Sequence, residues 1–321
     1  MVVKKICVIG AGNWGKNHVR TLHELGVLGG IVDISSDVLD KFSEKYSEVK
    51  TFLKLDNALL ENNFQGFTVA TPAGTHYEIA KKIIEAGKHV LVEKPLALNI
   101  KDAEQLEKLA IKNNVNLMVG HVLLFHPAIT KIKELISKGI IGKLQYIYSN
   151  RLNFGQVRTQ ENVFWSLAPH DISIFQYFID SFPEKIMANS SSFLQRGIDD
   201  STITQLKYPN GVEGHIFVSW LHPFKEHRLV IIGSEAMITF EDSAEGKPLK
   251  LYSQKFDMIS DVPEKIDGPM ELIEYEKKMP LSEELKYFVE HLDGAVLQIA
   301  NSQHALEVIK ILVQASKQLQ N

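Results

Sequence analysis

The chain has only one cysteine, Cys7, among its 321 residues, so no disulfide bond can form within it. It also has no uninterrupted apolar run that approaches the roughly 20 residues needed by a membrane-spanning helix. Basic residues are not in excess, because 35 Lys and Arg stand against 39 Asp and Glu and the formal net charge is −4. These absences argue against a disulfide-stapled secreted domain, a membrane protein and a nucleic-acid-binding protein. We therefore expect a reducing, cytoplasmic location.

The composition is that of an ordinary globular protein, with 45% hydrophobic and 23% charged residues. A length of 321 residues is more than one core usually supports, so two domains are expected. The first ten residues run from a basic pair straight into a glycine-rich segment, which predicts a first strand and no signal peptide.

A dinucleotide fingerprint follows that first strand. Lys5 to Ile9 is apolar and rich in β-branched residues, and a helical pattern begins just after Gly15. The glycines between them permit a tight turn, a close approach of the backbone to a pyrophosphate, and close packing of helix on strand. The predicted cofactor contacts in this loop are Gly10, Gly12, Asn13, Trp14 and Gly15.

The next strand, Gly30 to Val32, ends at Asp33. A carboxylate at this position accepts both hydroxyls of the adenosine ribose and repels a 2′-phosphate, so NAD is the expected cofactor. The alternative is that Asp33 caps the following helix, but Ser35 and Ser36 are available for that purpose.

Strand and helix patterns alternate as far as about residue 122, which predicts a doubly wound parallel sheet of the Rossmann type over residues 1–122. Within it, the strand Gly66 to Ala70 leads into Thr71-Pro72-Ala73-Gly74-Thr75-His76. The strand that begins at His89 ends in Glu93-Lys94-Pro95, and a further strand ends at His121. Ligands bind beyond the carboxyl ends of such strands, so these turns are expected to border the cofactor.

The glycine fingerprint and the Glu93-Lys94-Pro95 turn together resemble the glucose-fructose oxidoreductase/inositol dehydrogenase/MocA (Gfo/Idh/MocA) family of nicotinamide-dependent sugar dehydrogenases. The resemblance implies that Lys94 lies beside both the nicotinamide and the reacting hydroxyl. It also implies that Thr71, Pro72 and His76 lie alongside the cofactor, together with Glu93. By itself, His76 is more often a residue at a helix start than a ligand; with the resemblance, the two interpretations are about even.

After His121 the pattern changes to strand-like runs between residues 144 and 240, with Tyr208-Pro209-Asn210-Gly211 as a hairpin turn. We predict an α+β domain over residues 123–321 with an open, mostly antiparallel sheet covered by a helix from His170 to Phe178. Residues 242–280 are expected to be loosely structured, and Ser282 to Leu319 to be helical. An open sheet leaves one face to be covered by association, so a homodimer or homotetramer is expected.

Oxidising a secondary alcohol requires a base for the hydroxyl proton. His170 follows Trp165-Ser166-Leu167-Ala168-Pro169 and matches the histidine of the family's Asp-x-x-x-His pattern. The resemblance therefore implies that His170 is catalytic together with Lys94. Ser166 stands where the family commonly has the aspartate. Asp171 is interpreted as a helix cap, and the alternative is that it partly substitutes for that aspartate.

The segment Arg151 to Trp165 contains two arginines and an amide, and guanidinium groups bind phosphate oxygens bidentately. Together with the Ala168-Pro169-His170-Asp171 turn, this segment resembles the subgroup that oxidises C3 of UDP-N-acetylglucosamine ahead of an aminotransferase in lipid A and surface-glycan (lipopolysaccharide) biosynthesis. A solvated strand edge would explain either arginine equally well. The predicted substrate contacts are Lys94, His121, Arg151, Asn153, Arg158, Trp165 and His170.

Two other functions remain open from the sequence. One is a dehydrogenase or ketoreductase of a free sugar, an inositol or another nucleotide sugar, and the other is a non-catalytic NAD-binding regulator. Presence of both Lys94 and His170 argues against the regulator. No metal site is expected, because the paired histidines such as His18 and His23 are five residues apart, which does not place two ligands on one helical face.

Overall fold

A computed structural model of the chain describes residues 4–319, and they form two compact units. The first unit comprises the residues up to Phe125 together with Lys278–Ile309, and the second comprises His126–Lys277 with the residues from Lys310 onward. This division differs from the one expected at residue 122, because residues 278–309 return to the first unit. The ends of the two predicted domains, residues 1–3 and 320–321, lie outside the described residues.

The first unit is built on a parallel six-stranded sheet of order β3-β2-β1-β4-β5-β6, which confirms the predicted Rossmann topology. The strands are β1 (Lys5–Ile9), β2 (Leu28–Val32), β3 (Lys50–Phe52), β4 (Phe64–Val69), β5 (His89–Glu93) and β6 (Leu117–Gly120). The helices are α1 (Gly15–Glu24), α2 (Ser36–Lys45), α3 (Leu55–Leu59), α4 (His76–Glu85), α5 (Ile100–Asn113) and α8 (Pro280–Glu290), with short 3₁₀ helices η1 (Ala73–Thr75) and η2 (Val122–Phe125).

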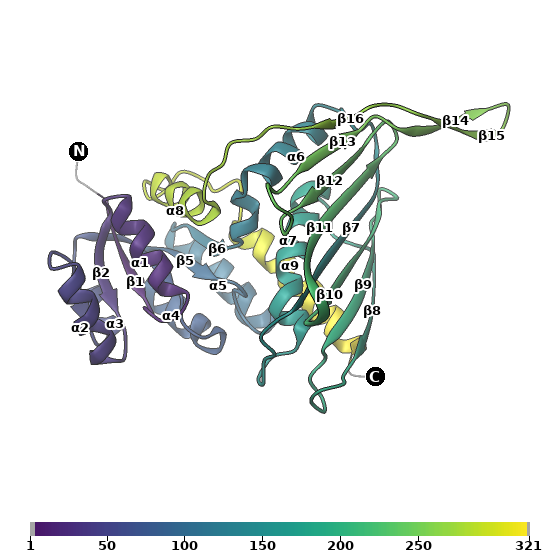
Figure 1. Cartoon of the computed structure of the whole chain (residues 1–321). Helices are drawn as coiled ribbons and strands as arrows, with labels where there is room; N and C mark the ends of the chain where they lie inside the picture. Colours follow the sequence, from purple (N-terminus) through teal and green to yellow (C-terminus); the bar gives the residue numbers. More distant parts are fainter. Residues whose placement is uncertain (1–3, 320–321) are drawn as a thin grey trace. The chain divides into compact units, whose positions relative to one another are not determined.

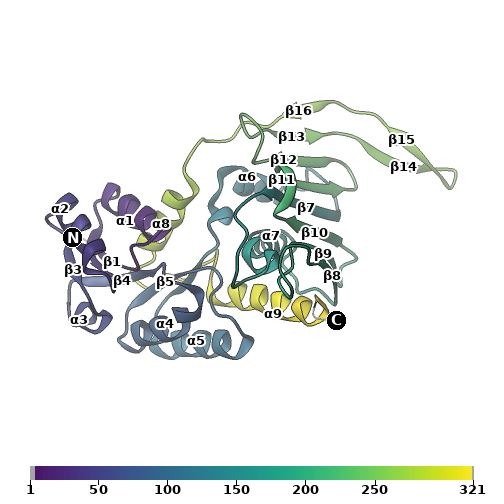
Figure 2. The same ribbon diagram turned by 60° about the horizontal axis from the view of Figure 1, so that its bottom comes forward.

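Helices cover both faces of this sheet, so its central strands are buried and read as continuous apolar runs. Helices α1 and α8 contact each other on one face, and α4 and α5 contact each other on the other face (Figure 2). Strands β1, β4 and β5 lie in the middle of the sheet. Their carboxyl ends therefore bring the glycine loop, the Thr71 turn and the Glu93-Lys94 turn to one edge.

The second unit contains an eight-stranded sheet of order β16-β13-β12-β11-β7-β10-β9-β8, in which only the β7–β10 pair is parallel. Its strands are β7 (Leu144–Phe154), β8 (Lys185–Ser191), β9 (Ser201–Lys207), β10 (Glu213–Ser219), β11 (Leu221–Gly233), β12 (Met237–Glu241), β13 (Leu249–Tyr252) and β16 (Met270–Leu272). Its helices are α6 (Pro127–Ser137), α7 (Val163–Ile179) and the part of α9 (Ser302–Leu319) from Lys310 onward. The predicted open, mostly antiparallel sheet is thus confirmed.

One face of this second sheet is covered and the other is open. Helix α7 packs on β7, β9 and β10, and in Figure 1 α6 and α7 lie on the same side of the sheet. Strand β9 alternates buried and exposed side chains along its length, as expected for a sheet with one face in the core. The turn predicted at Tyr208–Gly211 joins β9 and β10 as an antiparallel pair, which confirms it.

Three local predictions were wrong. The helix expected from His170 begins at Val163 instead, because the Asn162 side chain accepts a hydrogen bond from Trp165 N and caps it. Residues 242–280 are not loose, since they contain β13, β16 and the hairpin β14 (Lys255–Ile259) with β15 (Val262–Ile266). The single helix expected from Ser282 is divided into α8 and α9 (Ser302–Leu319), with Gly294 and Ala300 at positive φ between them.

Among residues 4–319, no helix combines the length and the apolar character needed to cross a membrane.

Candidate active site

The glycine loop between β1 and α1 has the shape that a dinucleotide requires. Gly10 has a φ of +84°, and a Cβ there would lie 2.8 Å from Thr71 Cγ2. A Cβ on Gly15 would lie only 1.8 Å from the carbonyl oxygen of Gly10. A Cβ on Gly12, by contrast, would meet no protein atom within 4 Å. The space above Gly12 is therefore open, and a pyrophosphate can approach the amides at the start of α1 there.

Asp33, at the end of β2, connects the glycine loop to β2 through hydrogen bonds. Its Oδ2 accepts a hydrogen bond from Ala11 N at 2.8 Å, and its Oδ1 accepts one from Ser35 N at 3.0 Å. The cap of α2 is Ser35, whose Oγ accepts from Val38 N. The carboxylate of Asp33 is thus held at the strand end where the adenosine ribose of a dinucleotide lies.

The Glu93-Lys94 turn is connected directly to the glycine loop. Glu93 is 8% exposed, and its Oε1 accepts hydrogen bonds from Trp14 Nε1 at 2.7 Å and from His18 Nε2 at 2.8 Å. Burial alone would raise the pKa of Glu93, but the hydrogen bond and charge of His18, followed by the contributions of Trp14 and Lys94, lower it. An ionised Glu93 therefore links the cofactor loop to Lys94, the residue that follows it.

His76 is 1% exposed and connects two turns of the site. Its Nδ1 lies 2.8 Å from the carbonyl oxygen of Pro95, and its Nε2 lies 2.8 Å from that of Thr71. Because backbone carbonyls occupy both ring nitrogens, this geometry favours a positioning role for His76 over the direct contact with the nicotinamide half that the resemblance implied. The side chain holds the Thr71 turn against the Lys94-Pro95 turn.

His121, at the end of β6, is buried, and neither of its ring nitrogens has a hydrogen-bond partner among the described residues. Burial lowers the pKa of His121 well below the usual range, and the nearby His304 and Lys94 lower it further. The ring is therefore neutral at physiological pH, and it packs edge-on against the ring of His304.

In the second unit, Arg151 of β7 is not free to bind phosphate. Its Nε donates to Asp171 Oδ2 at 2.7 Å and its Nη2 donates to Asp171 Oδ1 at 3.0 Å, and both residues are buried. The geometry favours a structural role for Arg151 over the predicted substrate contact. The interpretation of Asp171 as a helix cap is wrong, because it lies in the middle of α7 and both of its oxygens bond Arg151.

The other predicted substrate residues of this unit are more accessible. Arg158 is half-exposed beyond the end of β7, and its ion pair with Glu161 is loose, at 3.7 Å. Asn153 is partly buried, and its Oδ1 has no hydrogen-bond partner among the described residues. Trp165 donates through Nε1 to Ser316 Oγ at 2.9 Å, and His170 is partly exposed on α7. Arg158 is thus the predicted arginine that remains able to meet an anion.

Two buried residues of the first unit were missed as site residues. His18, three residues after Gly15, was considered only as a metal ligand, yet it holds Glu93. Glu284 of α8 is 0% exposed and contributes a carboxyl group to the interior. The sequence could have indicated that Glu284 is buried. It stands three residues after Leu281 and four before Phe288, which places it on the apolar face of an amphipathic helix.

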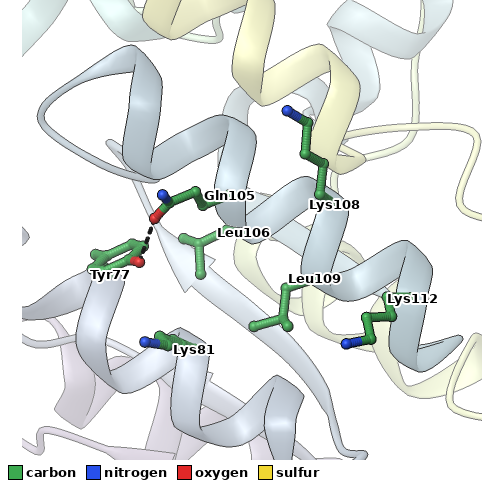
Figure 3. A pocket seen from close by; sticks show the side chains of 7 residues that line it. All are labelled: Tyr77, Lys81, Gln105, Leu106, Lys108, Leu109 and Lys112. Atoms are coloured by element: carbon green, nitrogen blue, oxygen red, sulfur yellow. Dashed lines mark hydrogen bonds between the residues drawn. The ribbon is translucent and has the colours of Figure 1, made fainter.

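A separate hollow of ≈ 380 Å³ lies between α4 and α5 (Figure 3). Tyr77 donates a hydrogen bond to Gln105 Oε1 at 2.6 Å across it. None of the predicted cofactor or substrate residues lines it; the lining residues are Tyr77, Lys81, Gln105, Leu106, Lys108, Leu109 and Lys112. Within residues 4–319, no group of three or more His, Cys, Asp or Glu is arranged to hold a metal ion.

Comparison with family models matches residues 4–121 to the Gfo/Idh/MocA oxidoreductase family with an NAD-binding Rossmann fold. Residues 129–239 match the C-terminal domain of the same family. The two matches together cover more than half of the chain, and they identify the cofactor as NAD.

Individual relatives are more distant. Myo-inositol 2-dehydrogenase of Thermotoga maritima is 25% identical over 266 residues, which are 79% of this chain and 79% of the relative. UDP-N-acetylglucosamine 3-dehydrogenase of Acidithiobacillus ferrooxidans is 26% identical over 191 residues, 59% of this chain and 58% of the relative.

Solved structures share the whole fold. That of the A. ferrooxidans enzyme, GnnA, has a TM-score of 0.87 at 20% identity and covers 99% of this chain and 98% of its own. The structure of GenD2 from gentamicin A biosynthesis, in complex with NAD, has a TM-score of 0.83 at 22% identity and covers 100% of this chain and 96% of its own.

The glycine loop predicts a clear difference between two substitutions. Gly12→Ala places a methyl group in open space, so thermal stability should stay within about 1–2 °C of wild type while NAD affinity falls about tenfold or more. Gly15→Ala forces a clash with the Gly10 carbonyl and should lower both stability and affinity. Thermal unfolding and NADH fluorescence titration measure the two effects. A Gly12→Ala protein that binds NADH normally would contradict this assignment of the pyrophosphate site.

Proposed function

Because the chain belongs to the Gfo/Idh/MocA family of NAD-dependent oxidoreductases acting on sugars, we propose that it oxidises C3 of UDP-N-acetylglucosamine, or of a related UDP-sugar, to the 3-keto sugar. The observation that carries the proposal is the position of Lys94 directly after β5. It follows Glu93 at the carboxyl end of β5, and Glu93 is tied to the NAD loop through Trp14. The keto product is the substrate that an aminotransferase requires, so a transamination step is expected to follow.

In the proposed reaction, bound NAD supplies the acceptor for the hydride that leaves the sugar carbon. Lys94 holds the hydroxyl through its ammonium group and stabilises the developing alkoxide, and His170 accepts the hydroxyl proton. A neutral His121 beside Lys94 adds no positive charge that would compete for the hydroxyl. The aspartate that the family commonly has four residues before this histidine is Ser166 here, and the neighbouring Asp171 is bound to Arg151.

Support for a UDP-sugar comes from the similarity to the A. ferrooxidans enzyme and from Arg158, whose guanidinium is half-exposed. The similarity to myo-inositol 2-dehydrogenase, which covers more of the chain, favours an uncharged polyol or a free sugar as the second candidate. The two candidate substrates differ in whether they carry phosphate. Removal of a cationic side chain that binds phosphate should therefore weaken binding of a UDP-sugar and leave binding of an uncharged sugar unchanged.

The reaction is tested by deuterium exchange into UDP-N-acetylglucosamine, followed by mass spectrometry and proton NMR. A 3-keto group acidifies the C2 hydrogen, so reversible oxidation should place deuterium at C2 in an NAD-dependent manner even if no NADH accumulates. Lys94→Ala should reduce the labelling rate by about 10²–10⁴-fold while NADH still binds. The exposed Lys101→Ala is the matched control. Wild-type protein that binds NAD but introduces no label would exclude this substrate.

Arg158 separates the two substrate classes. If it binds the diphosphate, Arg158→Ala should raise the KM for a UDP-sugar about 10–100-fold, the loss expected for a charge-assisted hydrogen bond, with little change in kcat. Activity on an uncharged sugar should not change. Arg196→Ala, which removes an exposed arginine of the same unit, serves as control. Equal KM values for wild type and Arg158→Ala with UDP-sugar would remove Arg158 from the substrate site.

We also propose that the protein is a homo-oligomer that associates through its second unit. The β14–β15 hairpin extends from β13 and β16 as a two-stranded arm (Figures 1 and 2), and such hairpins are only marginally stable alone. Phe256 is 65% exposed on it and Met258 is 67% exposed. A second copy that covers this apolar patch would stabilise the arm.

Phe256→Asp combined with Met258→Lys should therefore shift the mass measured by light scattering toward that of a monomer. The control is Ile111→Asp, which changes an exposed apolar residue of α5 and should leave the mass unchanged. Wild-type protein that is monomeric at high concentration, or a double variant of unchanged mass, would contradict association through the arm.

A further inference from the structure

Helix α8 carries one acidic side chain into the interior of the first unit. Glu284 lies on the buried face that it shares with Leu281, Leu285 and Phe288, and it is 0% exposed. Neither of its carboxyl oxygens has a hydrogen-bond partner among the described residues. An ionised carboxylate that lacks donors is strongly disfavoured in an apolar interior, whereas a protonated one is tolerated. The geometry therefore favours the neutral acid.

Among the described residues, no cation forms a hydrogen bond or an ion pair with the Glu284 carboxyl group. Helix α8 packs against α1 (Figure 2) and against η2, and η2 contains no titratable residue. From α1 comes His18, which is already bonded to Glu93. Glu93 and Lys94 lie at the end of β5, His121 follows β6, and His304, whose ring packs against that of His121, lies in α9. Among these, Glu93 is the charge that acts on Glu284.

The two carboxyl groups have opposite tendencies. Burial raises the pKa of Glu284 well above its usual range, and the negative charge of Glu93 raises it further. Glu93 is also buried, but its bonds to His18 and Trp14 lower its pKa. These opposite tendencies favour the proton on Glu284 and the negative charge on Glu93.

We propose that Glu284 is a positioning residue of the NAD site: it remains protonated at neutral pH, so that the buried Glu93–Glu284 pair carries a single negative charge. That one charge on Glu93 binds Trp14 of the glycine loop and His18 of α1, next to Lys94. A second negative charge would repel Glu93 and loosen the bonds that align the cofactor loop with the Lys94 turn. The inference concerns the NAD site and does not depend on which sugar is oxidised.

The proposal fixes the sign of a pH effect on stability. A glutamate whose pKa is raised in the folded state takes up a proton on folding, at any pH between its unfolded and folded pKa values. Its favourable contribution is fully present below the unfolded pKa, about 4.3, and is lost progressively as the pH rises toward the folded pKa. Glutamine at this position has the shape of the neutral acid and takes up no proton.

The test compares the thermal midpoints of wild type and Glu284→Gln from pH 5 upward. Above about pH 5 the thermal midpoint of the variant should rise relative to that of wild type by about 2–4 °C for each pH unit, until Glu284 ionises in the folded protein. Glu290→Gln, an exposed site on the same helix, makes the same change of charge and should show no such trend. A difference that is independent of pH, or that falls as the pH rises, would overturn the proposal.

The positioning role is tested by NADH titration of the same proteins over the same pH range. As long as the difference between the two thermal midpoints rises with pH, Glu284 is protonated in folded wild type, and the NADH affinities of wild type and Glu284→Gln should change in parallel. The difference stops rising at the pH where Glu284 ionises. Only above that pH should the NADH affinity of wild type fall relative to that of the variant. Loss of wild-type affinity at a lower pH, or parallel affinities after Glu284 has ionised, would contradict the positioning role. Neither readout uses a sugar, so failure here leaves the proposed reaction unaffected.

Discussion

The buried carboxylate of Glu93 is the interaction on which the NAD site depends. It accepts hydrogen bonds from Trp14 of the glycine loop and from His18 of α1, and the next residue in the chain is Lys94. The Glu93 carboxylate thus connects the glycine loop to Lys94, the residue proposed to bind the reacting hydroxyl. A buried charge is stable only with such donors, so the loss of either one should disturb both cofactor binding and catalysis.

The second unit uses a buried charge pair for a different purpose. Arg151 and Asp171 form two parallel hydrogen bonds between β7 and α7, so they fix the helix that carries His170 to the sheet beneath it. A bidentate pair restricts both translation and rotation of the helix on the sheet. The proposed base therefore stands on a rigid support, and recognition of an anionic substrate is left to more exposed residues such as Arg158.

Most of the first unit follows from local sequence patterns. Apolar runs of five or six residues, each ending in glycine or a polar turn, predict parallel strands, and the Gly10–Gly15 spacing predicts the dinucleotide loop. Predictions failed where distant segments decide the outcome. The strands between residues 242 and 280 are short and, apart from β13, mostly exposed, so burial does not mark them in the sequence, and pairing with neighbouring strands makes them strands.

By itself the sequence determined the Rossmann topology, the mostly antiparallel second sheet and NAD as the cofactor, because each depends on short-range patterns. Tertiary structure alone decided which charges neutralise one another. Arg151 has the chemistry of a phosphate ligand, but its partner Asp171 lies 20 residues away. Glu284 reads as an ordinary helix residue until the fold places it within reach of the Glu93 charge, since burial and neighbouring charge are properties of the packed chain.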